Sequence, residues 1–112
     1  MKYKIIPTPK FKKEVKRLAK KYPSLKSDLY LFEKELSDNP RLGTGLGNNA
    51  FKIRLAIKSK RKGKSGGARI ITYLIDKDFE IYLLTIYDKS EIEIIQDSVL
   101  KNLIAEIKGG NN

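Results

Sequence analysis

Hydrophobic positions recur along this chain with two periods, one typical of helices and one typical of strands. Residues 1–6 read as a short strand. Thr8 is then a predicted N-cap, and an apolar residue every three or four positions predicts a helix up to Tyr22. A second helical stripe runs over residues 25–36 and ends at the Asp-Asn-Pro stretch. The tight junction between these patterns predicts an αα-hairpin.

The middle of the chain changes to strand patterns. Residues 40–49 are rich in Gly and Asn and are expected to form a loop. Residues 50–58 alternate apolar and polar, which predicts a half-buried strand with one cationic face. After a loop over 59–67, two stretches apolar on both faces, 68–75 and 79–87, read as central strands joined by a short turn.

The last pattern is helical. Residues 90–93, Ser-Glu-Ile-Glu, have the form of a capping box that would open a helix closed by Gly109-Gly110. The element order is therefore strand, helix, helix, three meandering strands, helix. This order predicts an α+β fold in which an antiparallel sheet is flanked by helices, within one domain spanning 1–112.

Composition narrows the chemistry. The 112 residues contain no cysteine and no histidine, so disulfides, the usual zinc ligand sets and the usual acid–base residue are missing. No stretch approaches 18 apolar residues and no secretory leader pattern is present. We expect a cytoplasmic protein without a membrane partner, metal or cofactor.

Charge is segregated along the chain. The net charge is +11, and residues 40–75 contain nine basic residues and no Asp or Glu. The other residues carry 15 basic and 13 acidic side chains, which nearly balance. Solubility does not require such segregation, so a polyanion, most commonly nucleic acid, is the partner that this segment indicates.

The cationic strand face is the candidate site for chemistry. A period of two places Lys52, Arg54 and Lys58 on one face, and Arg69 begins the next strand, although its facing depends on the register. RNA supplies its own nucleophile, the 2′-hydroxyl, so a site needs mainly positioning and charge stabilisation. The planar guanidinium of one arginine can bind two phosphate oxygens. A lysine close to other cations has its charged form disfavoured, so it can act as acid or base. Tyr73 or Tyr87 could stack a base, although packing in the core or at a strand edge is the more ordinary use.

Three stretches together resemble a known family. "FKIRLA", "KGKSGGARIITYLI" and "EIYLLTIYDKSE" resemble the RelE/ParE superfamily of bacterial toxins, and most of all its HigB branch. The resemblance implies a microbial-ribonuclease-like fold and a toxin of a type II toxin–antitoxin pair that cleaves mRNA in the ribosomal A site. It also implies a cognate antitoxin, often with a helix-turn-helix domain, through which the complex binds its operator DNA.

The resemblance also implies residue roles. Lys52, Arg54, Arg69 and Lys89 match the catalytic basic positions. Tyr87 is a candidate for stacking on RNA, and the loop after the first cationic strand would face ribosomal RNA through Lys58, Lys60, Arg61, Lys62 and Lys64. The chain departs from RelE at Ser90, where RelE has an arginine, and at about Gln96, where RelE has a tyrosine; Lys89 and Tyr87 are the candidates to replace them.

Two other functions remain open at this point. A ParE-like toxin would bind DNA gyrase without nuclease activity, but members of that type usually lack the basic set. A non-catalytic RNA-binding protein could use the same patch. For such a protein, changing Arg69 to Ala would lower the affinity for RNA and would remove no cleavage, because the protein would have no cleavage activity.

Overall fold

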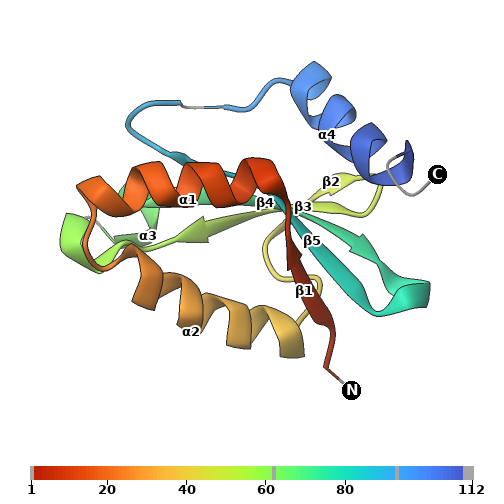
Figure 1. Ribbon diagram of the computed structural model, residues 1–112, viewed down its shortest axis with the longest axis horizontal. Helices are drawn as coiled ribbons and strands as arrows, with labels where there is room; N and C mark the ends of the chain where they lie inside the picture. The colour runs from red at the N-terminus through yellow and green to blue at the C-terminus, as the bar shows by residue number, and fades with distance from the viewer. Residues whose placement is uncertain (1, 62, 93, 110–112) are drawn as a thin grey trace.

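A computed structural model gives the structure of this chain, and it describes residues 2–61, 63–92 and 94–109. The fold begins with strand β1 (Lys4–Pro7), helix α1 (Pro9–Lys21) and helix α2 (Leu25–Asp38). The predicted start of α1 is confirmed, because the Thr8 hydroxyl accepts a hydrogen bond from the Phe11 N–H at 3.3 Å. α1 and α2 form the expected hairpin on one face of the sheet (Figure 1).

Five strands form a single sheet in the order β1-β5-β4-β3-β2. The four that follow α2 are β2 (Thr44–Gly47), β3 (Ala50–Leu55), β4 (Ala68–Ile75) and β5 (Glu80–Asp88). A four-residue helix, α3 (Gly63–Gly66), precedes β4, and the last helix is α4 (Asp97–Gly109). The predicted α+β class, with helices flanking a largely antiparallel sheet, is confirmed.

Two details of the sheet differ from the sequence-based expectation. β2 lies inside the predicted 40–49 loop and pairs antiparallel with the start of β3. β1 pairs parallel with β5, so the sheet is mixed rather than purely antiparallel. β2 contains two glycines in four residues, which hides a strand pattern.

The C-terminal helix begins later than the capping-box pattern predicted. Glu93 lies outside the described residues, and α4 begins at Asp97. Ser90 is not an N-cap, because its N–H and hydroxyl both donate to Asp88 Oδ1, at 2.9 and 2.7 Å. The side chain of Ser90 therefore closes a local turn after β5 instead of starting a helix.

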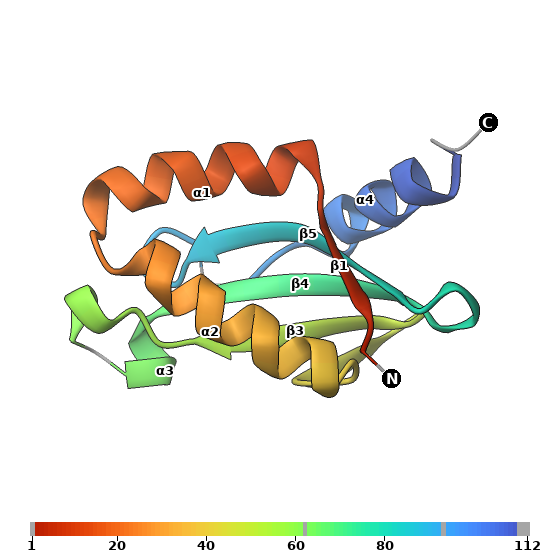
Figure 2. The ribbon, with the colours of Figure 1, turned by 60° about the horizontal axis from the view of Figure 1, so that its bottom comes forward.

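Two hydrophobic clusters lie on opposite faces of the sheet. The larger lies under α1 and α2 and includes Leu18, Leu25 and Phe32. The smaller lies on the other face, where Leu103 and Ile104 of α4 join a cluster with Tyr73 and Tyr87. The sheet therefore separates the α1–α2 face from the α4 face (Figure 2). None of the described helices is long and apolar enough to cross a membrane.

Candidate functional site

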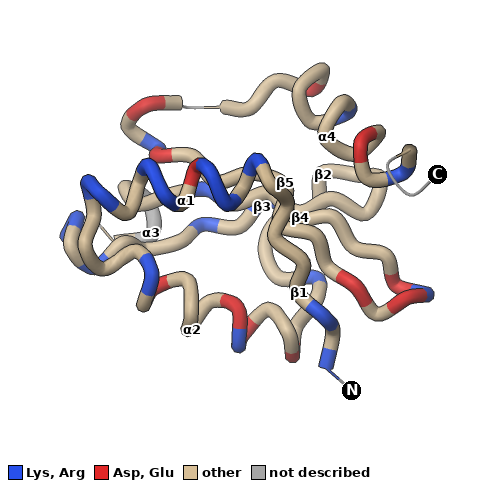
Figure 3. Tube along the Cα trace, viewed as in Figure 1, with Lys and Arg blue, Asp and Glu red and all other residues tan. Residues whose placement is uncertain are grey.

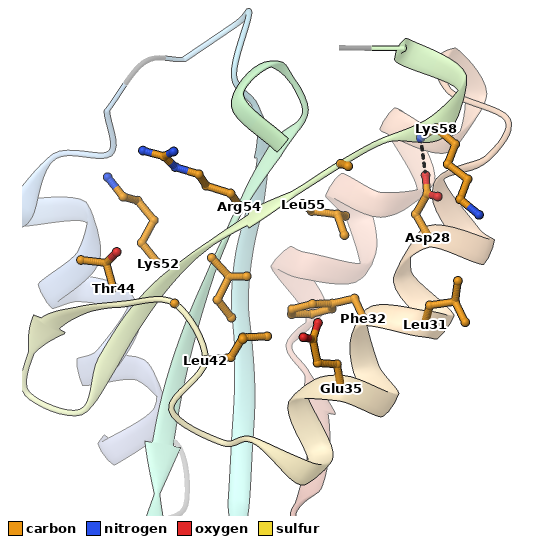
Figure 4. A pocket seen from close by; sticks show the side chains of 13 residues that line it. Asp28, Leu31, Phe32, Glu35, Leu42, Thr44, Lys52, Arg54, Leu55 and Lys58 are labelled. Atoms are coloured by element: carbon orange, nitrogen blue, oxygen red, sulfur yellow. Dashed lines mark hydrogen bonds between the residues drawn. The ribbon is translucent and has the colours of Figure 1, made fainter. Parts of the chain in front are cut away.

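Two of the predicted basic residues lie side by side on β3. Lys52 is half-buried and Arg54 is exposed, whereas the intervening Ile53 is buried in the α1–α2 core. Figure 4 shows the Lys52 and Arg54 side chains pointing to one side of β3 and Leu55 pointing toward Phe32 on the other. Residues two apart on a strand are separated by about 7 Å, so both reach the same stretch of a bound chain.

Arg69 joins them through the strand register. Arg54 of β3 lies opposite Arg69 of β4, and Arg69 lies opposite Tyr87 of β5. Residues directly opposite on antiparallel strands project to the same face. Arg54, Arg69 and Tyr87 therefore cross three strands in one line about 10 Å long. We call Lys52, Arg54 and Arg69 the basic row.

The spacing of the two arginines follows from the hydrogen-bond phase of the ladder. The Leu74 N–H donates to the Asn49 carbonyl at 2.9 Å, so the hydrogen-bonded positions of β3 are odd-numbered. Arg54 and Arg69 are thus a non-hydrogen-bonded pair, with Cα atoms about 4.5 Å apart. Like charges held this close oppose folding, which makes the pair more typical of an anion site than of a structural element.

Arg69 and Tyr87 are covered in this structure. Their exposed fractions are 5% and 4%. Ile95, from the segment between β5 and α4, packs against the cluster that contains Tyr87. Burial raises the pKa of the Tyr87 phenol, so it stays protonated at neutral pH. An RNA-stacking role for Tyr87, as predicted from the sequence, would require that segment to move.

The basic residues that follow β3 differ in their exposure. Lys58 and Arg61 are exposed, but only 8% of the Lys60 side chain is exposed, and its ammonium lies 2.5 Å from Asp88 Oδ1. Lys60, which was predicted to contact RNA, thus forms a buried ion pair in this structure, and its RNA contact stays a prediction. Lys58 lies beyond the end of β3, in a turn rather than on the face of Lys52 and Arg54. Lys62, and the side chain of Lys64, lie outside what the structure describes.

Asp88 is the functional neighbour that sequence reasoning missed. It is fully buried and accepts hydrogen bonds from Lys60, the Tyr22 hydroxyl and Ser90. Burial alone would raise the pKa of Asp88, but these donors outweigh it and hold the pKa well below its usual value. The basic segment is therefore anchored to the end of β5, beside the basic row. The signal in the sequence was one acidic residue, Asp88, at the end of a strand whose interior carries no charged residue.

Lys89 follows directly after Asp88. It is half-buried, and its backbone N–H donates to the Gly67 carbonyl at 3.1 Å. That bond ties the turn after β5 to the residue that precedes β4. Gly67 is required there, because a Cβ at this position would lie 2.0 Å from the Leu55 carbonyl oxygen. Lys89 and the basic row are thus held at one end of the β3–β4–β5 ladder.

A groove of about 720 Å³ runs between α2 and β3, beside the basic row. Its walls include Phe32, Leu42 and Leu55, and its lining also contains two carboxylates, Asp28 and Glu35, and three cations, Lys52, Arg54 and Lys58 (Figure 4). β2 pairs with β3 only as far as Lys52. The backbone N–H and C=O of Arg54, which point away from β4, therefore face the groove as an open strand edge.

The fold is similar to that of solved bacterial toxins. An arginine double mutant of the E. coli toxin RelE, in the free state, matches with a TM-score of 0.61 and 19% identity, covering 83% of this chain and 90% of that one. The RelBE2 toxin–antitoxin complex of Mycobacterium tuberculosis matches with a TM-score of 0.60 and 16% identity, covering 79% and 99%. The isolated E. coli RelE toxin matches with a TM-score of 0.58 and 17% identity, covering 94% and 98%. No protein-family model matches the sequence. This chain therefore has the fold of RelE toxins, at identities too low to carry over an activity or the HigB branch.

Proposed function

We propose that this chain is the toxin of a type II toxin–antitoxin pair and that it cleaves mRNA on the ribosome. The observation that carries the proposal is the basic row: Lys52, Arg54 and Arg69 on one sheet face of a RelE-like fold. The paired arginines suit a phosphate, because each planar guanidinium can donate to two oxygens. The presence of this basic set favours the nuclease over a toxin that binds DNA gyrase, since gyrase-directed members of the superfamily usually lack it.

In the proposed reaction the RNA 2′-oxygen attacks the adjacent phosphorus, and the bond to the 5′-oxygen breaks. The products are a 2′,3′-cyclic phosphate and a 5′-hydroxyl. Arg54 and Arg69 stabilise the negative charge that develops on the non-bridging oxygens. We assign the proton transfers to Lys52 and Lys89, which take the proton from the 2′-hydroxyl and give one to the leaving oxygen.

For RNA to reach Arg69, the segment after β5 and helix α4, which cover this face of the sheet, must move away. Of the 13 residues of α4, Leu103 and Ile104 are buried and Leu100 and Ile107 are partly buried against the same cluster, so one small apolar contact holds the helix on the sheet. Displacing the segment after β5 together with α4 exposes Arg69 and Tyr87 beside the already exposed Arg54. The bound RNA then occupies the face that α4 covers in the free chain.

The antitoxin is proposed to bind in the groove between α2 and β3. The open edge at Arg54 can accept an extended segment as an added strand, and the apolar walls take its alternate side chains. The three cations of the lining, Lys52, Arg54 and Lys58, outnumber its two carboxylates, Asp28 and Glu35, which favours an acidic segment bound along β3. Such a segment would mask two members of the basic row, and Leu42→Arg should weaken the complex without reducing cleavage.

The test of nuclease function is induced expression with primer extension on a reporter mRNA. Wild-type chain is expected to produce cuts within codons that disappear when the start codon is removed. Arg54→Ala should abolish the cuts, and Lys77→Ala, on the exposed turn before β5, is the matched control. Growth arrest without cuts would support the gyrase-directed function, and neither arrest nor cuts would leave a non-catalytic RNA-binding protein.

A further inference from the structure

Helix α1 carries more positive charge than its packing requires. Its 13 residues include seven Lys or Arg and one acid, Glu14, and there is no acid in the first turn. Cations at a helix N-terminus oppose the helix dipole, and lysines four residues apart repel each other. Each such effect lowers helix stability by a few tenths of a kcal/mol. The cations in the first half of α1 therefore oppose its folding, whereas Lys20 and Lys21 in the last turn suit the helix dipole.

Six of the seven cations of α1 divide into two sets, and the seventh, Lys13, forms no ion pair with any described residue. Lys10, Arg17 and Lys21 are paired with Glu14, Glu91 and Asp88. Lys12, Lys16 and Lys20 form no ion pair with any described residue, and they repeat every four positions. A rise of 1.5 Å per residue gives a line of three ammonium groups about 12 Å long on one side of the helix.

This line of lysines borders a groove between α1 and the start of α2. The groove has a volume of about 550 Å³ and is lined by Lys12, Lys16, Lys20 and Lys26 around Val15, Ala19 and Pro23. No carboxylate is among these lining residues. Figure 3 shows Lys and Arg following α1 and gathering at the α1–α2 junction, whereas the acidic positions of the β4–β5 turn lie at the other end of the sheet.

The groove and the basic row lie on different sides of the sheet. α1 and α2 cover the face opposite α4, and the basic row shares the α4 face with Tyr87. One RNA strand bound at the row would therefore leave the lysine groove free. Lysines are also suited to a different task from the paired arginines, since each is a mobile point charge that binds phosphate without fixed geometry.

We propose that the α1–α2 groove binds the sugar-phosphate backbone of a folded RNA, separate from the strand held at the basic row. The inference rests on the proposed function, because a nuclease that works on a ribonucleoprotein must hold structured RNA and the cut strand together. Recognition is by charge and by shape, without base contacts, as is usual for double-stranded RNA. The groove would bind the folded RNA and so position the toxin, and the basic row would cleave the separate RNA strand.

The experiment compares two triple variants with the same loss of charge. One replaces the groove lysines, Lys12→Gln with Lys16→Gln and Lys20→Gln. The control replaces exposed lysines elsewhere, Lys34→Gln with Lys77→Gln and Lys101→Gln. Binding of the full chain to an RNA duplex of about 16 base pairs is measured by fluorescence anisotropy, over KCl concentrations from about 50 to 200 mM.

The groove variant is expected to reduce the slope of log K against log[KCl] by about 2–3, because each lost phosphate contact removes slightly less than one unit. The control should keep the wild-type slope. An unchanged slope in the groove variant, including the case where the groove binds an acidic protein, would overturn the inference. Equal losses in both variants would also overturn it, since net charge alone would then explain binding.

Failure of this inference can be separated from failure of the proposed function. The duplex measurement involves no cleavage, so it tests RNA binding by the groove even if the wild-type chain cuts no message. In the reporter assay the groove variant should cut at the same positions as wild type but less often, because docking is weakened and the row is intact. Cutting at the wild-type level by that variant would count against the groove.

Discussion

The buried ion pair between Lys60 and Asp88 leads to the sharpest prediction on stability. Asp88→Asn keeps the shape of the side chain, and an amide can still accept from Ser90 and donate to the Tyr22 hydroxyl. What it removes is the negative charge that faces the buried Lys60 ammonium at 2.5 Å. The substitution therefore leaves an uncompensated cation in the interior.

The expected loss follows from that isolated charge. Breaking a buried pair by removing one partner typically lowers the free energy of unfolding by about 3–5 kcal/mol. Because Asn retains the neutral hydrogen bonds, we expect about 3 kcal/mol, at the lower end. With a urea dependence of about 2 kcal/mol per molar, the unfolding midpoint should fall by about 1.5 M.

The pH dependence gives a second signature. The pKa of Asp88 in the folded chain lies below its unfolded value of about 3.9. The carboxylate therefore stabilises the fold above about pH 4, and this contribution disappears as the pH falls through the folded pKa. The difference between wild type and Asp88→Asn should be largest near pH 7 and should shrink at pH 3.

The assay is urea unfolding followed by circular dichroism, with Asp78→Asn as the matched control. Asp78 is exposed, so its substitution should change stability by less than about 0.5 kcal/mol. Adding Lys60→Met to Asp88→Asn should recover part of the loss, because no buried charge then remains. The reasoning is refuted if Asp88→Asn unfolds at the same urea concentration as Asp78→Asn, or if the double variant shows strictly additive losses.

Three further variants, one of them with two readouts, test the structure. Gly67→Ala should prevent normal pairing of β3 with β4, since its Cβ would lie 2.0 Å from the Leu55 oxygen, and loss of amide-exchange protection in both strands would show it. Thr8→Ala should lower the free energy of unfolding by about 1 kcal/mol, measured in urea, because the Phe11 N–H loses its cap. Arg54→Ala should leave that free energy within about 0.5 kcal/mol of wild type, because the side chain is exposed. The same variant should cut a reporter message on ribosomes about 100-fold more slowly or worse, and wild-type cutting would remove Arg54 from the site.

Local patterns in the sequence predicted the helices and central strands well, because their signals lie within a few residues. Thr8 and Pro9 marked the start of α1, and the apolar runs marked β4 and β5. The prediction at Ser90 was wrong, since its hydroxyl could either accept from a helix N–H as an N-cap or donate to the carboxylate two residues earlier. The Ser90 hydroxyl donates to Asp88, and α4 begins at Asp97.

Pairings between distant segments could not be read in the same way. Alternation placed Lys52 and Arg54 on one face, but only the register between β3 and β4 places Arg69 opposite Arg54. The segment around Lys60 had no acid near it in sequence, yet the fold brings Asp88 to it. Both results depend on which strands neighbour each other, and that is a property of the whole sheet.

The parallel pairing of β1 with β5 has a consequence for synthesis. Lys4 emerges from the ribosome first, but its partner in the sheet, Glu80, is added only after every other strand has begun. Such long-range pairing delays folding, and β5 also supplies Tyr87 and Asp88 beside the basic row. A nascent chain therefore cannot assemble the row on its support until translation has passed β5. Under the proposed function, the site that would cut mRNA therefore forms only after β5 has been synthesised.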